Sequence, residues 1–261
     1  MLASLKREVK AMKVTKYGLF ILITLLIFAF VGTALAGPFG SPEPRAKEKT
    51  GFFVGAGYWY NEDKFKYDES DFKIKHNQAY IEIGQSFSNA EIIARIGASD
   101  AKATDLSDSF KPFGTLGLKG YVPLGSNFGI GPIVQGTYYF GDFKDNVIVR
   151  SGASTASAQV KIKDYWDVRG GVALQATITP QFKVYAGPFA YYSESKLEIS
   201  LPPGWIWVST GTSVSSATAK SKSNFGGFGG VDLPLTKEFH INLETQYSES
   251  FSGGASLSYS F

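Results

Sequence analysis

The sequence predicts an all-β chain that closes into an antiparallel transmembrane β-barrel. Three observations predict this fold: segments in which apolar and polar residues alternate, very short turns that alternate with long polar loops, and two rows of aromatic residues along the apolar side of the segments. Successive side chains of a strand point to opposite faces, so such alternation indicates strands with one apolar face and one polar face.

The alternating segments give ten expected strands, at residues 51–60, 76–87, 90–98, 113–122, 128–140, 165–178, 182–193, 223–233, 239–247 and 253–261. Four short turns and five longer excursions join them. An even number of strands is typical of bacterial barrels, and eight strands is the alternative. Gly131–Pro132 and Gly187–Pro188 lie inside expected strands, and since proline cannot donate to the ladder, we expect a β-bulge at each.

The two faces of the expected strands differ in charge. The more apolar faces carry no charged residue, whereas the opposite faces carry several. Aromatic residues lie on the apolar faces in two rows, with Phe87, Phe128, Phe182, Phe239 and Phe261 at the short-turn ends and Tyr138, Tyr192 and Tyr247 farther along. Such rows match the aromatic girdles of a barrel that crosses a membrane, and a membrane does not tolerate an open sheet edge.

Residues 1–36 have the pattern of a cleaved secretory signal peptide. A lysine-rich start precedes an apolar run at 19–31, and Ala34-Leu35-Ala36 matches a cleavage site. Met12 is an alternative start of the chain. An uncleaved membrane anchor over about residues 17–36 is the other interpretation.

Two further segments complete the expected organisation. Residues 37–49 contain three prolines and five charged residues without periodicity, which predicts a flexible periplasmic linker. The barrel is expected to occupy residues 50–261.

The composition excludes several classes of function. The 261 residues include no cysteine, which excludes thiolate metal sites, thiol catalysis and a lipidated cysteine, and only two histidines, too few for a histidine-rich metal site. The net charge of +3 comes from residues 1–36, which carry +4, so the rest totals −1 and has no signature of nucleic-acid binding. We predict no catalytic, cofactor-binding or metal-binding residues.

The C-terminus resembles the terminal signature of bacterial outer-membrane proteins. Leu257, Tyr259 and Phe261 alternate with serines and end the chain on an aromatic residue. The span from Gly51 to Phe261 resembles the small barrels of the OmpA, OmpX and opacity-protein type, although Ser256 stands where that family often has glycine. The resemblance implies the outer membrane of a Gram-negative bacterium, with short periplasmic turns and long extracellular loops. It also implies two partners, outer-membrane lipid and the barrel-assembly machinery that reads the final aromatic residue.

The lumen is expected to hold a polar network rather than an open passage. The network comprises Glu82, Arg95, Lys119, Asp167, Arg169 and Glu244. A two-residue turn at Ser88–Asn89 would place Glu82 directly opposite Arg95, and the same counting places Asp232 opposite His240. Unpaired buried charges are costly, so we expect paired charges, with a charge-selective constriction as the alternative.

The loops offer the remaining functional candidate. Trp205, Ile206 and Trp207 lie in an extracellular excursion, where they either pack within the loop or form a surface for an extracellular ligand. The omptins, ten-stranded outer-membrane proteases, resemble the chain in architecture but need aspartate pairs and an Asp-x-His motif that it lacks. The sequence therefore predicts a non-enzymatic barrel with a structural and surface-interaction role. A narrow porin-like channel for ions or small solutes is the alternative.

Overall fold

The computed structural model describes residues 38–45, 50–67, 70–100, 110–151, 154–202, 214–221, 225–248 and 250–261. The chain divides into two compact units, Met1–Gly32 and Thr33–Phe261, and all described residues belong to the second. The expected signal peptide lies outside the described residues. Within the described ranges, no helix is long and apolar enough to cross a membrane.

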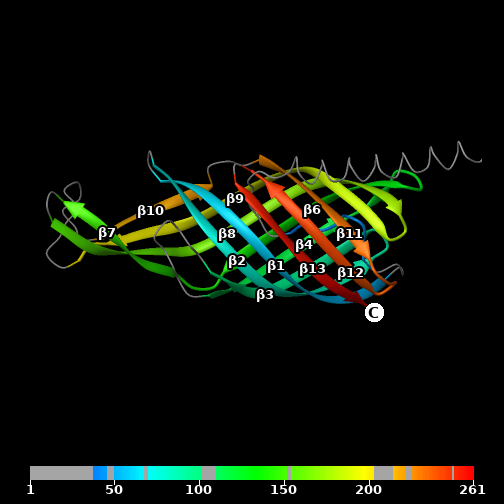
Figure 1. The fold of residues 1–261 in the computed structure, drawn as a ribbon, viewed down its shortest axis with the longest axis horizontal. Coiled ribbons are helices and arrows are strands. Elements are labelled where there is room, and N and C mark those ends of the chain that lie inside the picture. The colour runs from blue at the N-terminus through cyan, green and yellow to red at the C-terminus, as the bar shows by residue number, and fades with distance from the viewer. Residues whose placement is uncertain are drawn as a thin grey trace, which may run out of the picture. The chain divides into compact units, whose positions relative to one another are not determined.

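Ten antiparallel strands of the described residues form a closed ring. Figure 1 shows these strands from the side of the ring. They are β1 (Thr50–Tyr67), β2 (Ser70–Phe87), β3 (Ala90–Ser99), β4 (Lys111–Gly120), β6 (Phe128–Tyr139), β8 (Ser154–Thr179), β9 (Phe182–Ser200), β11 (Phe225–Pro234), β12 (Phe239–Tyr247) and β13 (Phe251–Ser260). Each strand pairs with the next, and β13 pairs with β1 to close the ring. The all-β barrel of ten strands predicted from the sequence is confirmed, and the eight-stranded alternative is wrong.

The faces of the strands are inverted relative to a soluble protein. Along β12 the inward His240, Asn242, Glu244 and Gln246 are buried, whereas the outward Leu243 and Tyr247 are exposed. The same holds around the ring, where Leu116 is 70% exposed and Leu174 is 59% exposed. Large contiguous apolar surfaces are rare on soluble monomers, so this outer surface fits the hydrocarbon layer of a membrane.

The long excursions contain more β-structure than the sequence analysis expected. β1 and β2 continue as a hairpin through the expected loop at 61–75. β7 (Phe143–Ser151) pairs with the first half of β8, and β10 (Val214–Ser221) pairs with the second half of β9. The sequence does contain a strand pattern in the first half of β8, where Ala158, Val160 and Ile162 alternate with polar residues. These three side chains are buried in the structure. We call this side of the barrel the hairpin end and the opposite side the short-turn end.

The bulges expected at the two Gly-Pro pairs are absent from the described registers. Gly131 and Pro132 pair in unbroken register with Ala173 and Val172. On the other side of β6 the pairing stops at Lys119–Ile133 and resumes in the same register at Val122–Ile130, within the short β5 (Val122–Pro123). A Cβ on Gly131 would lie 2.0 Å from the carbonyl oxygen of Gly120. Glycine is therefore required because two backbones approach closely there, and not because a β-bulge inserts an extra residue.

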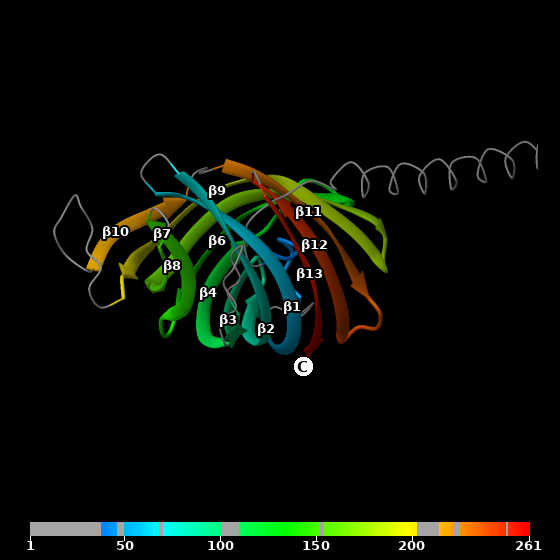
Figure 2. The ribbon, with the colours of Figure 1, turned by 60° about the vertical axis from the view of Figure 1, so that its left-hand side comes forward.

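Two clusters of apolar side chains fill parts of the lumen. Toward the hairpin end, Trp59, Tyr80, Phe113 and Tyr139 belong to a larger cluster that includes residues of β7 to β10. Closer to the short-turn end, Phe39 packs with residues of β6, β8, β9 and β11. Figure 2 shows the strands surrounding the blue segment that contains Phe39. Buried side chains of the strands, together with Phe39 from before the first strand, therefore lie inside the ring.

Candidate functional site

Two direct cross-strand ion pairs lie in the short-turn half of the lumen. Glu82 lies opposite Arg95, and Glu91 lies opposite Lys119. Arg95 Nε is 3.1 Å from Glu82 Oε2, and Lys119 Nζ is 2.7 Å from Glu91 Oε1. All four side chains are buried. The Glu82–Arg95 register predicted from the turn at Ser88–Asn89 is confirmed.

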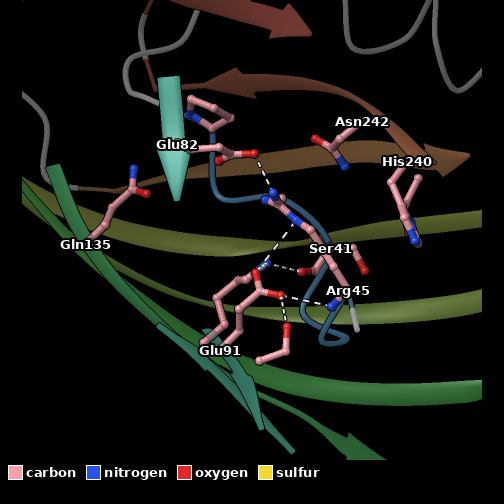
Figure 3. A network of polar contacts seen from close by, with 12 residues as sticks. Ser41, Arg45, Glu82, Glu91, Gln135, His240 and Asn242 are labelled. Carbon is pink, nitrogen blue, oxygen red and sulfur yellow. Dashed lines mark hydrogen bonds and ion pairs between the residues drawn. The ribbon is translucent and has the colours of Figure 1, made fainter. Parts of the chain in front are cut away.

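Residues 38–45, expected as part of a flexible linker, lie inside the lumen. Arg45 forms ion pairs with both Glu82 and Glu91, and Figure 3 shows its guanidinium between the two carboxylates. Its backbone N–H also donates to Glu91 Oε2 over 2.9 Å. The guanidinium carbon lies 4.4 Å from the centre of the Phe53 ring. For these residues the expectation of a flexible linker is wrong, because they are buried or half-buried and Arg45 has buried partners on the barrel wall.

Glu244 holds the other end of this segment. Its carboxylate accepts hydrogen bonds from the backbone N–H groups of Phe39 and Gly40, over 2.9 and 2.7 Å. Tyr185 and Gln246 also donate to it, over 2.8 and 2.6 Å. Four donors on one carboxylate stabilise its charged form, since hydrogen bonds to an anion are stronger than neutral ones. Glu244 thus binds the backbone of the segment.

The middle of the segment is held by two lysines and a glutamine. Lys119 Nζ donates to the Ser41 carbonyl oxygen over 2.9 Å. Lys183 Nζ forms an ion pair with Glu43 over 2.8 Å, and Gln175 donates to the same carboxylate over 2.5 Å. Lys119 therefore bridges the barrel wall and the segment.

Phe39 anchors the segment by packing. The side chain is buried, and its ring centre lies 4.8 Å from that of Phe228 and 5.6 Å from that of Phe189. Arg95 Nη1 donates to the carbonyl oxygen of the preceding Pro38 over 2.8 Å. Aromatic side chains contribute much of the energy of buried contacts, so Phe39 is the apolar anchor beside a polar network.

Other predicted lumen residues lie apart from this cluster. Asp167 and Arg169 pair with one another along β8, with 3.0 Å between Arg169 Nε and Asp167 Oδ1. Asp232 does not face His240 directly as expected, because the turn at 235–238 pairs His240 with Pro234 and Asp232 with Asn242. His240 Nδ1 still lies 3.6 Å from Asp232 Oδ1, since diagonal neighbours on one face remain within reach.

The predicted assembly signal lies on the outer surface of β13. Leu257 and Phe261 are exposed. Tyr259 contacts Phe239 and Phe261, with ring centres 4.9 and 5.0 Å apart. The backbone N–H of Phe261 donates to the carbonyl oxygen of Phe52 over 2.9 Å. Trp205, Ile206 and Trp207 lie outside the described residues.

Sequence reasoning identified the charged residues of the wall but missed what they bind. Glu91 and Lys183 were not part of the predicted network, although their alternation with apolar neighbours indicates inward faces. No strand pattern marks residues 38–45, so their burial could not be found from periodicity. The one local signal is Phe39 itself, a large apolar residue followed by Gly40 in an otherwise polar stretch.

Comparison with known proteins finds likeness in structure but not in sequence. No protein-family model and no curated protein matches the chain. The outer membrane protein OprG from Pseudomonas aeruginosa is 13% identical, with 84% of this chain and 99% of that chain covered and a TM-score of 0.37. The attachment invasion locus protein Ail of Yersinia pestis is 13% identical, with coverages of 82% and 100% and a TM-score of 0.33. The outer membrane protease OmpT from Escherichia coli is 12% identical, with coverages of 81% and 96% and a TM-score of 0.41.

At such identities the likeness concerns the fold alone. The closed antiparallel ring and its exposed apolar surface are those of an outer-membrane β-barrel, so the resemblance stated from the sequence is confirmed at the level of fold.

Proposed function

We propose that the protein is an integral outer-membrane barrel of a Gram-negative bacterium with a non-enzymatic, structural and surface-interaction role. In this proposal a cleaved signal peptide at 1–36 directs export, and the barrel-assembly machinery reads Leu257, Tyr259 and Phe261. The short-turn end faces the periplasm and the hairpin end faces the outside. Support comes from the leader pattern, the apolar outer surface that meets lipid, and the exposed aromatic residue at the C-terminus.

The observation that carries the proposal is the set of buried polar and aromatic side chains inside the ring. The two cross-strand ion pairs, residues 38–45 and the aromatic cluster around Tyr139 all lie there. Side chains fill the interior of barrels with about eight strands, and open aqueous channels use about sixteen or more. In this proposal, the side chains inside the ring block the passage of solutes. The two ends of the barrel are then its functional surfaces.

The hairpin end is the larger of the two surfaces. Here β7 to β10 continue beyond the ring as paired strands, and β10 also pairs with β1. Ion pairs stiffen this extension, as between Lys163 and Glu198, where Nζ and Oε2 are 2.7 Å apart. The sequence between β9 and β10 contains Trp205 and Trp207, and their role in binding an extracellular ligand stays a prediction.

A narrow channel for ions or small solutes is the second candidate, because the inward faces carry charges of both signs. The deciding experiment is conductance of the full mature chain in planar lipid bilayers. We expect no steady conductance above that of the bare membrane. Steady, charge-selective openings that change with Arg95→Gln or Lys119→Gln would replace the proposed role by the channel.

A further inference from the structure

The contacts of residues 38–45 resemble those of a bound ligand rather than those of a strand. No backbone pairing joins the segment to the described strands. Instead, side chains from many strands reach inward to it, including Glu82 on β2, Glu91 on β3, Lys119 on β4, Gln175 on β8, Lys183 on β9 and Glu244 on β12. Such a ring of contacts exists only when the barrel has closed, so the wall forms the site and the segment occupies it.

Three features make the site selective for a peptide of a particular pattern. An aromatic pocket takes Phe39, and the carboxylate of Glu244 takes two consecutive backbone N–H groups. Six residues after Phe39, Arg45 places its guanidinium between two buried carboxylates. Between these anchors Gly40 has a φ of 77°, a conformation that favours glycine because it has no Cβ.

Charges on the wall match charges on the segment, since Arg45 lies between Glu82 and Glu91 and Glu43 pairs with Lys183. Glu82 and Glu91 each have one cation from the wall, Arg95 and Lys119, and Arg45 adds a third positive charge between them. Glu244 has no ion pair among the described residues and depends on neutral donors, two of which come from the segment. Withdrawing the segment would leave these carboxylates short of buried partners, which is costly.

We propose that the short-turn half of the lumen is a peptide-binding site, and that residues 38–45 of the same chain are its resident ligand. The site recognises a short peptide with the pattern Phe-Gly, followed by arginine six residues after the phenylalanine. A chain whose own segment is weakened binds such a peptide from solution. This inference goes beyond the surface role and does not depend on it.

The first test asks whether the segment is docked in the full mature chain. The chain has no cysteine, so Ser41→Cys introduces a single thiol at a position that is 6% exposed. We expect a polar maleimide to label it at least about tenfold more slowly than the thiol of Lys237→Cys in an exposed short turn. When Phe39→Ala and Arg45→Gln are added to the Ser41→Cys chain, its labelling rate should rise to that of Lys237→Cys. Equal rates without these changes, or a slow rate that survives them, would overturn the proposal.

The second test measures binding in trans. The probe is a fluorescent peptide of residues 37–45, Gly-Pro-Phe-Gly-Ser-Pro-Glu-Pro-Arg, added to the detergent-solubilised full chain carrying Phe39→Ala and Arg45→Gln. We expect saturable binding, with affinity at least about tenfold above that for the wild-type chain, whose site is occupied. Absence of binding by a folded variant, or equal binding by the wild type, would overturn the proposal.

A matched pair of substitutions locates the bound peptide. In the chain that carries Phe39→Ala and Arg45→Gln, called the weakened chain, Glu244→Gln should lower the affinity for the peptide by about tenfold or more. The reason is that a neutral amide accepts the two N–H groups less strongly than a carboxylate does. Glu238→Gln alters an exposed glutamate in the turn beside β12 and should leave the affinity unchanged. Equal effects of the two changes would place the peptide outside the lumen. If the weakened chain does not fold, the labelling of Ser41→Cys in the otherwise wild-type chain still decides the question.

Discussion

Glu82 and Arg95 lie directly opposite each other on β2 and β3, and their side chains form a buried ion pair of 3.1 Å. Glu82 also pairs with Arg45 of the N-terminal segment. One carboxylate thus serves two guanidinium groups, whereas each arginine has a further acceptor, Glu91 for Arg45 and the Pro38 carbonyl for Arg95. Loss of Glu82 therefore removes a partner from two arginines, whereas loss of Arg95 removes only one of the two partners of Glu82.

This inequality predicts an asymmetric double-mutant cycle. Glu82→Gln should lower the free energy of unfolding by about 3–5 kcal/mol, because two buried cations lose their carboxylate. Arg95→Gln should cost less, since Glu82 keeps Arg45. The double variant should cost less than the sum of the single ones. Denaturant unfolding of the solubilised barrel measures all three, and strict additivity would mean that the two residues do not interact.

The terminal aromatic residue should govern assembly. Phe261 is 71% exposed, so replacing it with alanine removes little packing, yet it should sharply reduce the fraction of folded barrel in the membrane. The matched control is Phe225→Ala at the opposite end, where the side chain is 75% exposed. Heat-dependent gel mobility separates folded from unfolded barrel. If both variants lower the fraction of folded barrel equally, Phe261 has no special role in assembly.

The orientation of the barrel is open to direct labelling. Lys196→Cys places a thiol on the hairpin end, where the lysine side chain is 65% exposed, and Lys237→Cys places one in a short turn. A membrane-impermeant maleimide should label the first on intact cells and the second only after the outer membrane is permeabilised. The reverse pattern would invert the proposed topology.

The hairpin extension should show a local pH effect. A hydrogen bond from Lys163 lowers the pKa of the Glu198 carboxyl below its usual value. A lowered folded-state pKa means that the contact stabilises the hairpin above the ordinary glutamate pKa and is lost as the pH falls through the lowered value. Carboxyl NMR should find the pKa of Glu198 closer to its ordinary value in Lys163→Gln. Lys220→Gln, which removes the partner of Glu194 instead, should leave it unchanged.

The sequence by itself determined the ring of strands. Alternation in segments such as 239–247 separates Leu243 from Glu244, and because successive side chains point to opposite faces, it specifies which residues face lipid and which face the lumen. Short turns then set the register locally, which is why the Glu82–Arg95 pair was predictable. The pairing of Asp232 was not, since the turn at 235–238 moves its partner by two residues, from His240 to Asn242.

Only the tertiary structure decided what fills the barrel. Arg45 contacts Glu82 and Glu91, and Phe39 contacts Phe189 and Phe228, across large separations in the chain. No local pattern records these contacts, because the site is created when the ring closes and brings distant strands around one segment. Prolines and charges that indicate a solvated spacer in an isolated stretch become ligands of the wall once buried partners of opposite charge surround them.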